Sequence, residues 1–279
     1  MKQGPVSIPQ YLEQLGTNRT SPMRAFAEEF LEMHRTSLAP FSKKWVANPF
    51  NQWSRQWEYP FCHEAINKYA ATQEHPIRVL DAGSGITFFP FYLSESDPVN
   101  HITCCDLDPA LATSFSTITE NGNRKVGFIN RNLADTGLQD HSIDAIYCIS
   151  VLEHISARED ILQEFHRLLR PGGLLAITFD ISLDGLGDIS PEELPLMIKA
   201  LRKLFAPDDS GSLEALENGK HLLERDIVST QYIANRHPAL LPWRYPLLSS
   251  IKSALLKRRI PSSRIKQLTF SSHTFRAKP

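Results

Sequence analysis

The stretch Ile77-Arg78-Val79-Leu80-Asp81-Ala82-Gly83-Ser84-Gly85 decides the fold of this chain. A short apolar run that ends at a glycine-rich turn is typical of a buried β-strand. The turn lets the backbone come close to a ligand, because glycine has no Cβ. Open α/β sheets bind their ligands at such turns, at the carboxyl ends of the strands. We therefore predict an α/β fold with a ligand site directly after this strand.

Four further apolar runs follow this first strand. A helix is predicted between the last two of them, over 157–169, because its apolar residues have helical spacing and Pro171-Gly172-Gly173 would stop it. Continuous apolar strands that alternate with helices are typical of a parallel sheet covered on both faces. The predicted fold is a Rossmann-like, doubly wound, mostly parallel sheet, whose later strands lie at 102–105, 126–129, 145–148 and 174–179.

The chain on either side of this core is helical in character. Ser21-Pro22 predicts a helix start with Ser as the cap, and a second helix is expected from Pro60 to about Thr72. One strand-like run, 267–275, lies near the end, and the sequence shows no partner for it. The predicted organisation is a helical N-terminal cap, the core, and a helical substrate-cap insertion with a final core strand, at 1–74, 75–183 and 184–279.

Composition excludes several classes of protein. Apolar residues make up 42% of the 279 residues and the formal net charge is −1, which does not favour a nucleic-acid partner. We find neither a signal peptide in residues 1–16 nor an apolar run near the roughly 20 residues that a membrane span needs. The cysteines have no metal-binding spacing, so we expect no metal, and reduced thiols in a cytoplasmic protein, at Cys62, Cys104, Cys105 and Cys148.

Two acidic residues indicate the chemistry of the ligand. Asp81 lies two positions before the first glycine, where a carboxylate would repel a pyrophosphate and attract an ammonium group. Asp106 ends the second predicted strand, 25 residues after Asp81, where a carboxylate accepts hydrogen bonds from ribose hydroxyls. This pair disfavours a nicotinamide oxidoreductase. It favours S-adenosylmethionine, in which an ammonium group lies near a sulfonium.

Five motifs carry a resemblance to a known family. The run 79–85 resembles the glycine-rich first motif of class I S-adenosylmethionine-dependent methyltransferases, and Cys105-Asp106-Leu107-Asp108-Pro109 resembles their second motif. Three more motifs are similar in order and spacing, at 132–144, 151–155 and 169–173. The resemblance covers residues 76–182 and implies a seven-stranded core sheet with S-adenosylmethionine as the cofactor.

The resemblance also implies roles for single residues. The glycine-rich turn would wrap the methionine part, with Asp81 near its amino group, and Asp106 would hold the ribose. Leu107 would pack on the adenine, Asn132 would accept from its amine, and Leu133 would offer its backbone N–H. With residues at the path to the methyl group and in the cap, the predicted cofactor set is Asp81, Ala82, Gly83, Ser84, Gly85, Asp106, Leu107, Asn132, Leu133, Ile149, Ser150, Trp57 and Tyr59.

The chain departs from the family pattern after the glycine-rich turn. Thr87 stands where the family often has a third glycine, and Pro90 suits only the first turn of a helix. We therefore expect the next helix to begin near Phe89, with Thr87 as a candidate cap. Phe88 or Phe89 could then face the ligand, although core packing is the favoured role for either.

His154 is the candidate catalytic residue. It follows the fourth strand, where a neutral imidazole could take a proton from an acceptor hydroxyl or amine. An architectural role for His154 is an equally weighted alternative. Arg55, Trp57 and Tyr59 could close over the methionine end, with Arg55 pairing with its carboxylate, although a purely structural role is favoured for these residues.

The predicted function is transfer of a methyl group to an O, N or C nucleophile of a small-molecule acceptor, of metabolite or sugar-like type. Two alternatives remain open: another S-adenosylmethionine-using transferase on the same fold, and a catalytically inactive cofactor-binding partner subunit. The oligomeric state and the identity of the acceptor do not follow from the sequence, because the cap and insertion match no pattern.

Overall fold

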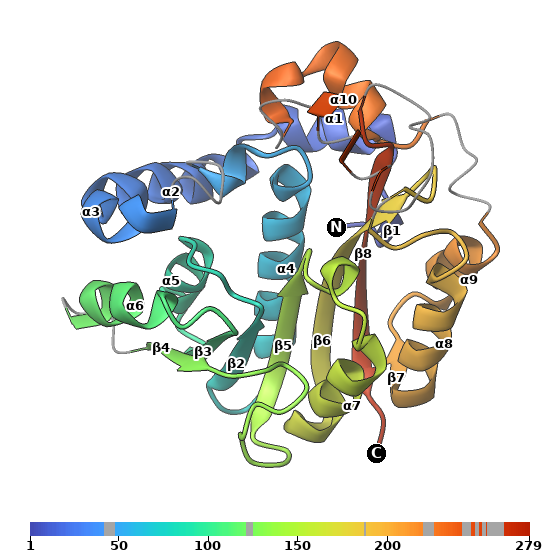
Figure 1. Ribbon diagram of the computed structural model, residues 1–279. Helices are drawn as coiled ribbons and strands as arrows, with labels where there is room; N and C mark the ends of the chain where they lie inside the picture. Colours follow the sequence, from blue (N-terminus) through green and yellow to red (C-terminus); the bar gives the residue numbers. More distant parts are fainter. Residues whose placement is uncertain are drawn as a thin grey trace.

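The structure is a computed structural model. Its central layer is a twisted sheet with helices on both faces (Figure 1). No helix among the described residues is long and apolar enough to cross a membrane. The described residues are 1–41, 48–120, 125–186, 188–219, 226–241, 247–248, 251–252, 255 and 265–279.

The strand order of the sheet is β1-β8-β6-β5-β2-β3-β4, with β7 paired to β8. The five central strands are parallel to one another, as predicted, and β8 is antiparallel to its neighbours. From β2 the chain first moves outward to β3 and β4, then returns to β5 on the other side of β2. The order therefore reverses beside β2, which is where such sheets bind ligands. The parallel strands are β2 (Ile77–Ala82), β3 (Val99–Asp106), β4 (Val126–Asn130), β5 (Ile143–Ile149) and β6 (Leu169–Ser182).

The last strand has the partners that the sequence did not reveal. β8 (Leu268–Ala277) pairs along its length with β6, and also with β7 (Phe205–Pro207) and β1 (Gly4–Pro5). β7 and β1 have three and two residues, too few to show an alternating pattern. The sheet thus contains the seven predicted strands and an eighth, β1, from the N-terminal zone.

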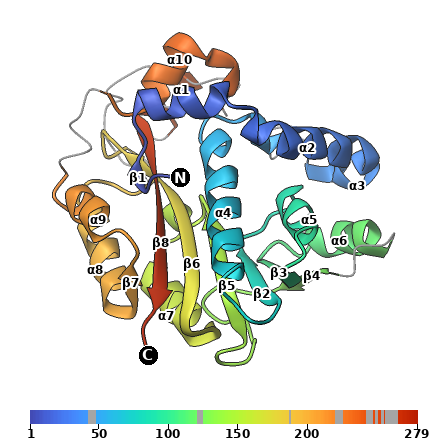
Figure 2. The same ribbon diagram turned by 180° about the vertical axis from the view of Figure 1, so that it is seen from behind.

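Residue alternation along the strands divides the core into two halves. Val79 packs in one apolar cluster and Leu80 in the other, because successive side chains of a strand point to opposite faces. The first cluster lies under α4 (Arg55–Ala70), α5 (Phe89–Ser94) and α6 (Leu111–Glu120), on the face that Figure 2 shows. The second cluster lies under three helices on the other face: α7 (Arg158–Leu168), α8 (Leu194–Leu204) and α9 (Ser210–Glu217).

Two helix boundaries in the N-terminal zone differ from the prediction. The helix expected from Pro60 begins at Arg55, because the buried side chains of Trp57, Tyr59 and Phe61 stabilise helix on both sides of the proline. Ser21 is the first residue of its helix and Thr20 is the cap. The N-terminal helices are α1 (Ile8–Gly16), α2 (Ser21–Met33) and α3 (Arg35–Leu38), and α10 (Thr230–Arg236) lies beside α1 (Figure 1).

Candidate cofactor and catalytic site

The turn after β2 is held open by glycine. Gly83 has φ +74°, and a Cβ added to it would lie 2.5 Å from Cγ2 of Val151. The backbone N–H groups of Gly83 and Ser84 both donate to the carbonyl oxygen of Cys105, at 2.9 and 3.1 Å. These bonds fix the turn against the end of β3. No side chain other than hydrogen fits at Gly83 without displacing Val151.

Asp106 lies at the end of β3 and is tied to the same turn. Its Oδ2 accepts a hydrogen bond from the Gly85 N–H at 2.9 Å, and its Oδ1 accepts one from the Asp108 N–H at 3.0 Å. Each carboxylate oxygen has a second lone pair, so Asp106 is able to accept further hydrogen bonds from a ligand. Asp106 therefore orients the turn and faces the ligand at once.

Asp81 is a buried carboxylate beside the turn. It is the fifth residue of β2, and the alternation that turns Val79 toward α4 turns Asp81 the same way. Its exposed fraction is 5%, and burial raises the pKa of this carboxyl from 3.8 to about 7. A cationic group placed against Asp81 would stabilise its ionised form.

These residues surround one cavity of about 390 Å³ at the carboxyl ends of β2, β3 and β5. The cavity is also lined by residues that the sequence did not indicate as ligand contacts, such as Pro49, Gln52 and Tyr147. The predicted site residues that line it are Tyr59, Asp81, Gly83, Ser84, Gly85, Asp106, Ile149, Ser150 and His154.

Trp57 and Ala82 were predicted to bind the cofactor, and neither lines this cavity. In α4, Arg55 and Tyr59 are four residues apart and share the cavity face, whereas Trp57 is rotated from Arg55 by about 200°. Its ring is buried on the side of α1 instead. Ala82 follows Asp81 in β2 and therefore points to the opposite core half. Sequence proximity alone placed these two residues in the predicted set.

Three predicted adenine contacts lie beyond the cavity, next to Asp106. Leu107 is 64% exposed, which is unusual for a large apolar side chain. Asn132 is exposed, and its Oδ1 accepts a hydrogen bond from the Ala134 N–H at 3.0 Å. The Leu133 side chain is buried in the core. This end of the site is open, so the enclosed cavity does not extend to it.

The helix turn at the start of α4 is locked to the end of β5. Arg55 and Glu58 form an ion pair, and Arg55 donates to Oγ of Ser150 at 2.6 Å. Ser150, whose φ is +51°, donates in turn to Oε1 of Glu58 at 2.8 Å. Arg55 lines the cavity, and its carboxylate partner in this structure is Glu58. The network holds the N-terminal zone over the cofactor cavity.

His154 lies in a short 3₁₀ helix, Leu152–His154, directly after β5. Its side chain is 65% exposed and lines the cavity, and Nδ1 lies 3.6 Å from Oδ1 of Asp188. Withdrawal of one edge of the ring from water lowers the pKa of His154, and the Asp188 carboxylate acts in the opposite direction. No sequence signal indicated Asp188, which belongs to the segment after β6.

Glu153, the neighbour of His154, has a local role. Its Oε1 accepts a hydrogen bond from the Asp180 N–H at the end of β6, at 3.1 Å. Burial raises the pKa of Glu153 to about 8. No described residue of 184–279 lines the cofactor cavity, and the substrate-cap role of that segment stays a prediction. One wall of the cofactor cavity comes from the N-terminal zone, at Pro49, Gln52, Arg55 and Tyr59.

Residues 80–177 match the methyltransferase domain family. The order of strands, the glycine-rich turn and the two acids are those of the class I fold. This part of the chain has the fold of the class I S-adenosylmethionine-dependent methyltransferases, whose cofactor is S-adenosylmethionine.

Individual relatives are similar to this chain at low sequence identity or over only part of its length. A sterol 24-C-methyltransferase of Aspergillus fumigatus is 24% identical over 194 residues, which are 68% of this chain and 50% of that protein. An O-methyltransferase of Aspergillus nomiae is 34% identical over 120 residues, 42% of this chain and 52% of that protein. The chain thus spans about half the length of these curated relatives.

Solved structures share the fold at low identity. A geranyl diphosphate methyltransferase in complex with GPP and sinefungin has a TM-score of 0.51 at 13% identity, over 78% of this chain and 76% of that one. The cyclase SpnF has a TM-score of 0.51 at 17% identity, over 81% of this chain and 83% of that one. These likenesses concern the fold alone.

Proposed function

We propose that this chain transfers the sulfonium methyl group of S-adenosylmethionine to an O, N or C nucleophile of a small-molecule acceptor. One observation carries the proposal: Asp81 and Asp106 face a single cavity from either side of a turn that only glycine allows. When bound, the cofactor supplies an activated methyl group that needs little covalent help. The chain would contribute alignment of the acceptor and exclusion of water.

The residues present fit this cofactor. A Cβ at position 83 would collide with Val151. Because Gly83 has none, its backbone stays open to the methionine part of the cofactor. Asp81 would pair with the ammonium group, and Asp106 would accept from the ribose hydroxyls. The exposed Leu107 would pack on the adenine, with Asn132 and the Leu133 N–H at its edge. Arg55 would approach the carboxylate with the guanidinium nitrogens that Glu58 and Ser150 do not use.

His154 is proposed as the general base for an alcohol acceptor. The Asp188 carboxylate on the Nδ1 side favours the tautomer that carries its proton there, so that Nε2 is free to accept one. A lowered pKa keeps the ring neutral near pH 7. For an acceptor that loses its proton to water unaided, His154 would only orient the loop after β5.

The relatives support a small-molecule acceptor. Their names include sterol C-methylation and O-methylation, and they match 194 and 120 residues of this chain. The net charge of −1 gives no support for a nucleic-acid partner. We place the protein in the cytoplasm, on the support of four cysteines that are all free and buried.

Calorimetry with S-adenosylhomocysteine, S-adenosylmethionine and NAD tests the proposal. We expect binding of the first two and none of NAD. Asp106→Ala should weaken binding by about 1.5 to 3 kcal/mol, because charge-assisted hydrogen bonds to the ribose are lost. Asp97→Ala, at an exposed loop position, is the matched control. Tighter binding of NAD than of S-adenosylhomocysteine would refute the cofactor assignment.

Labelled methyl transfer into a pool of metabolites separates an enzyme from an inactive subunit. We expect label in a small-molecule product with the wild type and strongly reduced label with Asp106→Ala. Binding of S-adenosylhomocysteine without transfer to any acceptor would favour the inactive partner subunit.

A further inference from the structure

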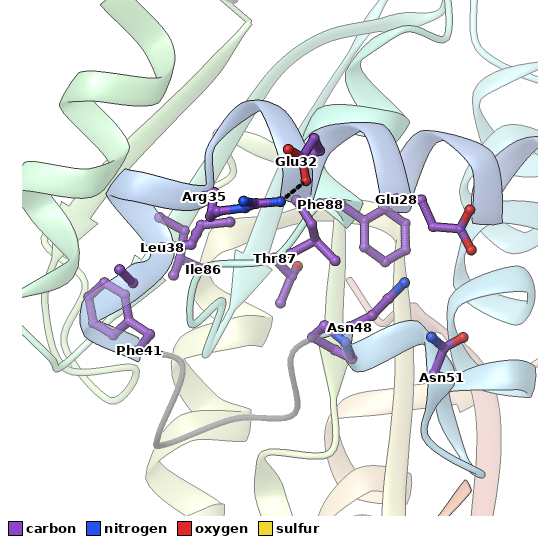
Figure 3. Close-up of a pocket in the computed structure, with 13 residues that line it drawn as sticks. Glu28, Glu32, Arg35, Leu38, Phe41, Asn48, Asn51, Ile86, Thr87 and Phe88 are labelled. Atoms are coloured by element: carbon purple, nitrogen blue, oxygen red, sulfur yellow. Dashed lines mark hydrogen bonds and ion pairs between the residues drawn. The ribbon is translucent and has the colours of Figure 1, made fainter. Parts of the chain in front are cut away.

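A second and larger cavity, of about 600 Å³, lies between the N-terminal helices and the chain just after the glycine-rich turn (Figure 3). One side is formed by α2, α3 and the short helix Ala39–Phe41. The other sides are residues 86–88 and the short helix Pro49–Asn51. Its volume is within the range of sites for drug-sized molecules. We call this space the cap cavity.

The cap cavity adjoins the cofactor cavity. Pro49 and Thr87 line both spaces, and the consecutive residues Phe88 and Phe89 face one space each. The ring of Tyr59 packs against both phenylalanines, with centroids 5.1 and 4.9 Å away. A molecule in the cap cavity would therefore have its inner end at Pro49 and Thr87, beside the cofactor.

The lining of the cap cavity is largely apolar. Its apolar residues come from three separate parts of the chain, and Ile86, Phe88 and Phe41 are almost fully buried. Figure 3 shows these three side chains among the residues that line the cavity, with Ile86 between Phe41 and Phe88. An apolar lining binds uncharged apolar groups by excluding water. The apolar lining is Leu31, Leu38, Ala39, Phe41, Pro49, Ile86 and Phe88.

The other lining residues are polar, and several of them are held by other bonds: Glu28, Glu32, Arg35, Asn48, Asn51 and Thr87. Oδ1 of Asn48 accepts from the Phe50 N–H at 3.0 Å, and Oδ1 of Asn51 accepts from Arg24 at 2.7 Å. These bonds orient both amides, whose NH₂ groups keep the ability to donate. On the opposite side, Glu32 and Arg35 form an ion pair at the exposed rim (Figure 3). The arrangement suits a molecule with an apolar body and a few oxygen acceptors.

We propose that the cap cavity is the acceptor site and that its occupant is an uncharged, largely apolar alcohol. The apolar body lies against Phe41, Ile86 and Phe88, and the nucleophilic oxygen lies at the inner end between Pro49 and Thr87. This inference rests on the proposed methyl transfer and narrows its acceptor, which the sequence had favoured as metabolite or sugar-like.

The test fills the cavity from α2. Leu31→Trp places an indole in the cap cavity, whereas Met33→Trp, on the same helix at a position 68% exposed and outside the lining, is the matched control. The probe is N-phenyl-1-naphthylamine, an uncharged dye that fluoresces in apolar surroundings. We expect the wild type and Met33→Trp to bind it alike. Leu31→Trp should bind it at least about tenfold more weakly, which corresponds to about 1.4 kcal/mol.

Two further measurements decide whether the cavity serves the acceptor. S-adenosylhomocysteine affinity should stay within about twofold in both variants, since residue 31 does not line the cofactor cavity. In labelled transfer, uncharged, largely apolar alcohols should accept the methyl group and sugars should not. Leu31→Trp should raise the KM for the alcohol at least about tenfold. If Leu31→Trp lowers the melting temperature so far that it does not fold, Leu38→Trp from α3 replaces it.

The outcomes separate this inference from the proposed function. Equal dye binding by Leu31→Trp and the wild type, or transfer only to sugars and other polar acceptors, would overturn the acceptor assignment and leave the methyltransferase proposal standing. Absence of any S-adenosylhomocysteine binding would refute the proposed function itself. Loss of cofactor binding in Leu31→Trp alone would show that the cap cavity belongs to the cofactor, and would also overturn the inference.

Discussion

Asp188 reaches His154 from a segment 34 residues further along the chain, with Oδ1 3.6 Å from Nδ1. The carboxylate is enclosed, since the side chain is only 7% exposed, and its Oδ2 has no hydrogen-bond partner among the described residues. Asp188 also has φ +51°, a backbone conformation that costs energy for a residue other than glycine. The fold thus holds a buried negative charge on one side of a ring whose other side faces the cofactor cavity.

His154→Ala tests the proposed base. With an alcohol acceptor, we expect turnover to fall by roughly 10²- to 10⁴-fold, because no other described group is proposed to take the proton. Affinity for S-adenosylhomocysteine, measured by calorimetry, should change less than about twofold. His166→Ala, on α7 and outside the cavity, is the control. Joint loss of stability and cofactor affinity, with turnover nearly intact at saturation, would assign His154 an architectural role.

Asp188→Asn tests the positioning role through the pH dependence of turnover. The rate should fall at low pH, because a protonated imidazole accepts no proton. The Asp188 carboxylate raises the pKa of His154, so its removal should move this acid limb to lower pH. The plateau should also drop, since Nδ1 loses its partner. Asp184→Asn in the same loop should leave the limb in place. An unshifted limb in Asp188→Asn would remove Asp188 from the mechanism.

The affinity for the cofactor should depend on pH through Asp81. The ionised carboxylate is the form that attracts an ammonium group, and its pKa in the ligand-free protein is about 7. Below that pH, the association constant should fall by up to about tenfold per pH unit, and above it the constant should be flat. Calorimetry with S-adenosylhomocysteine from pH 5 to 9 measures this, with Asp81→Asn expected to be weaker and pH-independent over this range.

The stability of the ligand-free protein gives an independent check on Asp81. Its pKa in the folded state lies above the ordinary value of 3.8, so the folded state binds the proton more tightly than the unfolded state does. This contribution to stability is present below about pH 4 and is lost as pH rises to about 7. Asp81→Asn should lack this loss in thermal denaturation. An identical pH profile in both proteins would contradict the pKa assignment.

Gly83→Ala tests the shape of the turn. The positive φ costs an alanine about 1 to 2 kcal/mol, and contact with Val151 adds overpacking of about 1 to 3 kcal/mol. Gly137→Ala is the matched control, because Gly137 has φ +71° and open space around its Cβ position. We expect both variants to lose stability in urea unfolding, and only Gly83→Ala to lose cofactor binding at least about tenfold. Equal binding by both would show that the turn tolerates a Cβ.

Local sequence was sufficient for much of the fold. The five parallel strands and the helix now seen at Arg158–Leu168 were predicted from apolar periodicity and glycine-rich stops. The helix after the turn begins at Phe89, as Pro90 required, and the Phe89 N–H donates to Oγ1 of Thr87 at 3.3 Å. These features depend on residues within a few positions of one another. The start of α4 at Arg55 did not follow from local signals, because burial of its aromatic residues overrides the proline.

By itself, the sequence determined the glycine-rich turn, the two acids and the positions of the five parallel strands along the chain, since each is encoded by neighbouring residues. Only the tertiary structure decided which side chains share a space. It turned Trp57 away from the cofactor cavity and brought Asp188 to His154 from a distant loop. It also enclosed the cap cavity between α2 and Phe88. The physical reason is that a pocket is formed by packing between segments far apart in the chain, and no local pattern records which segments will meet.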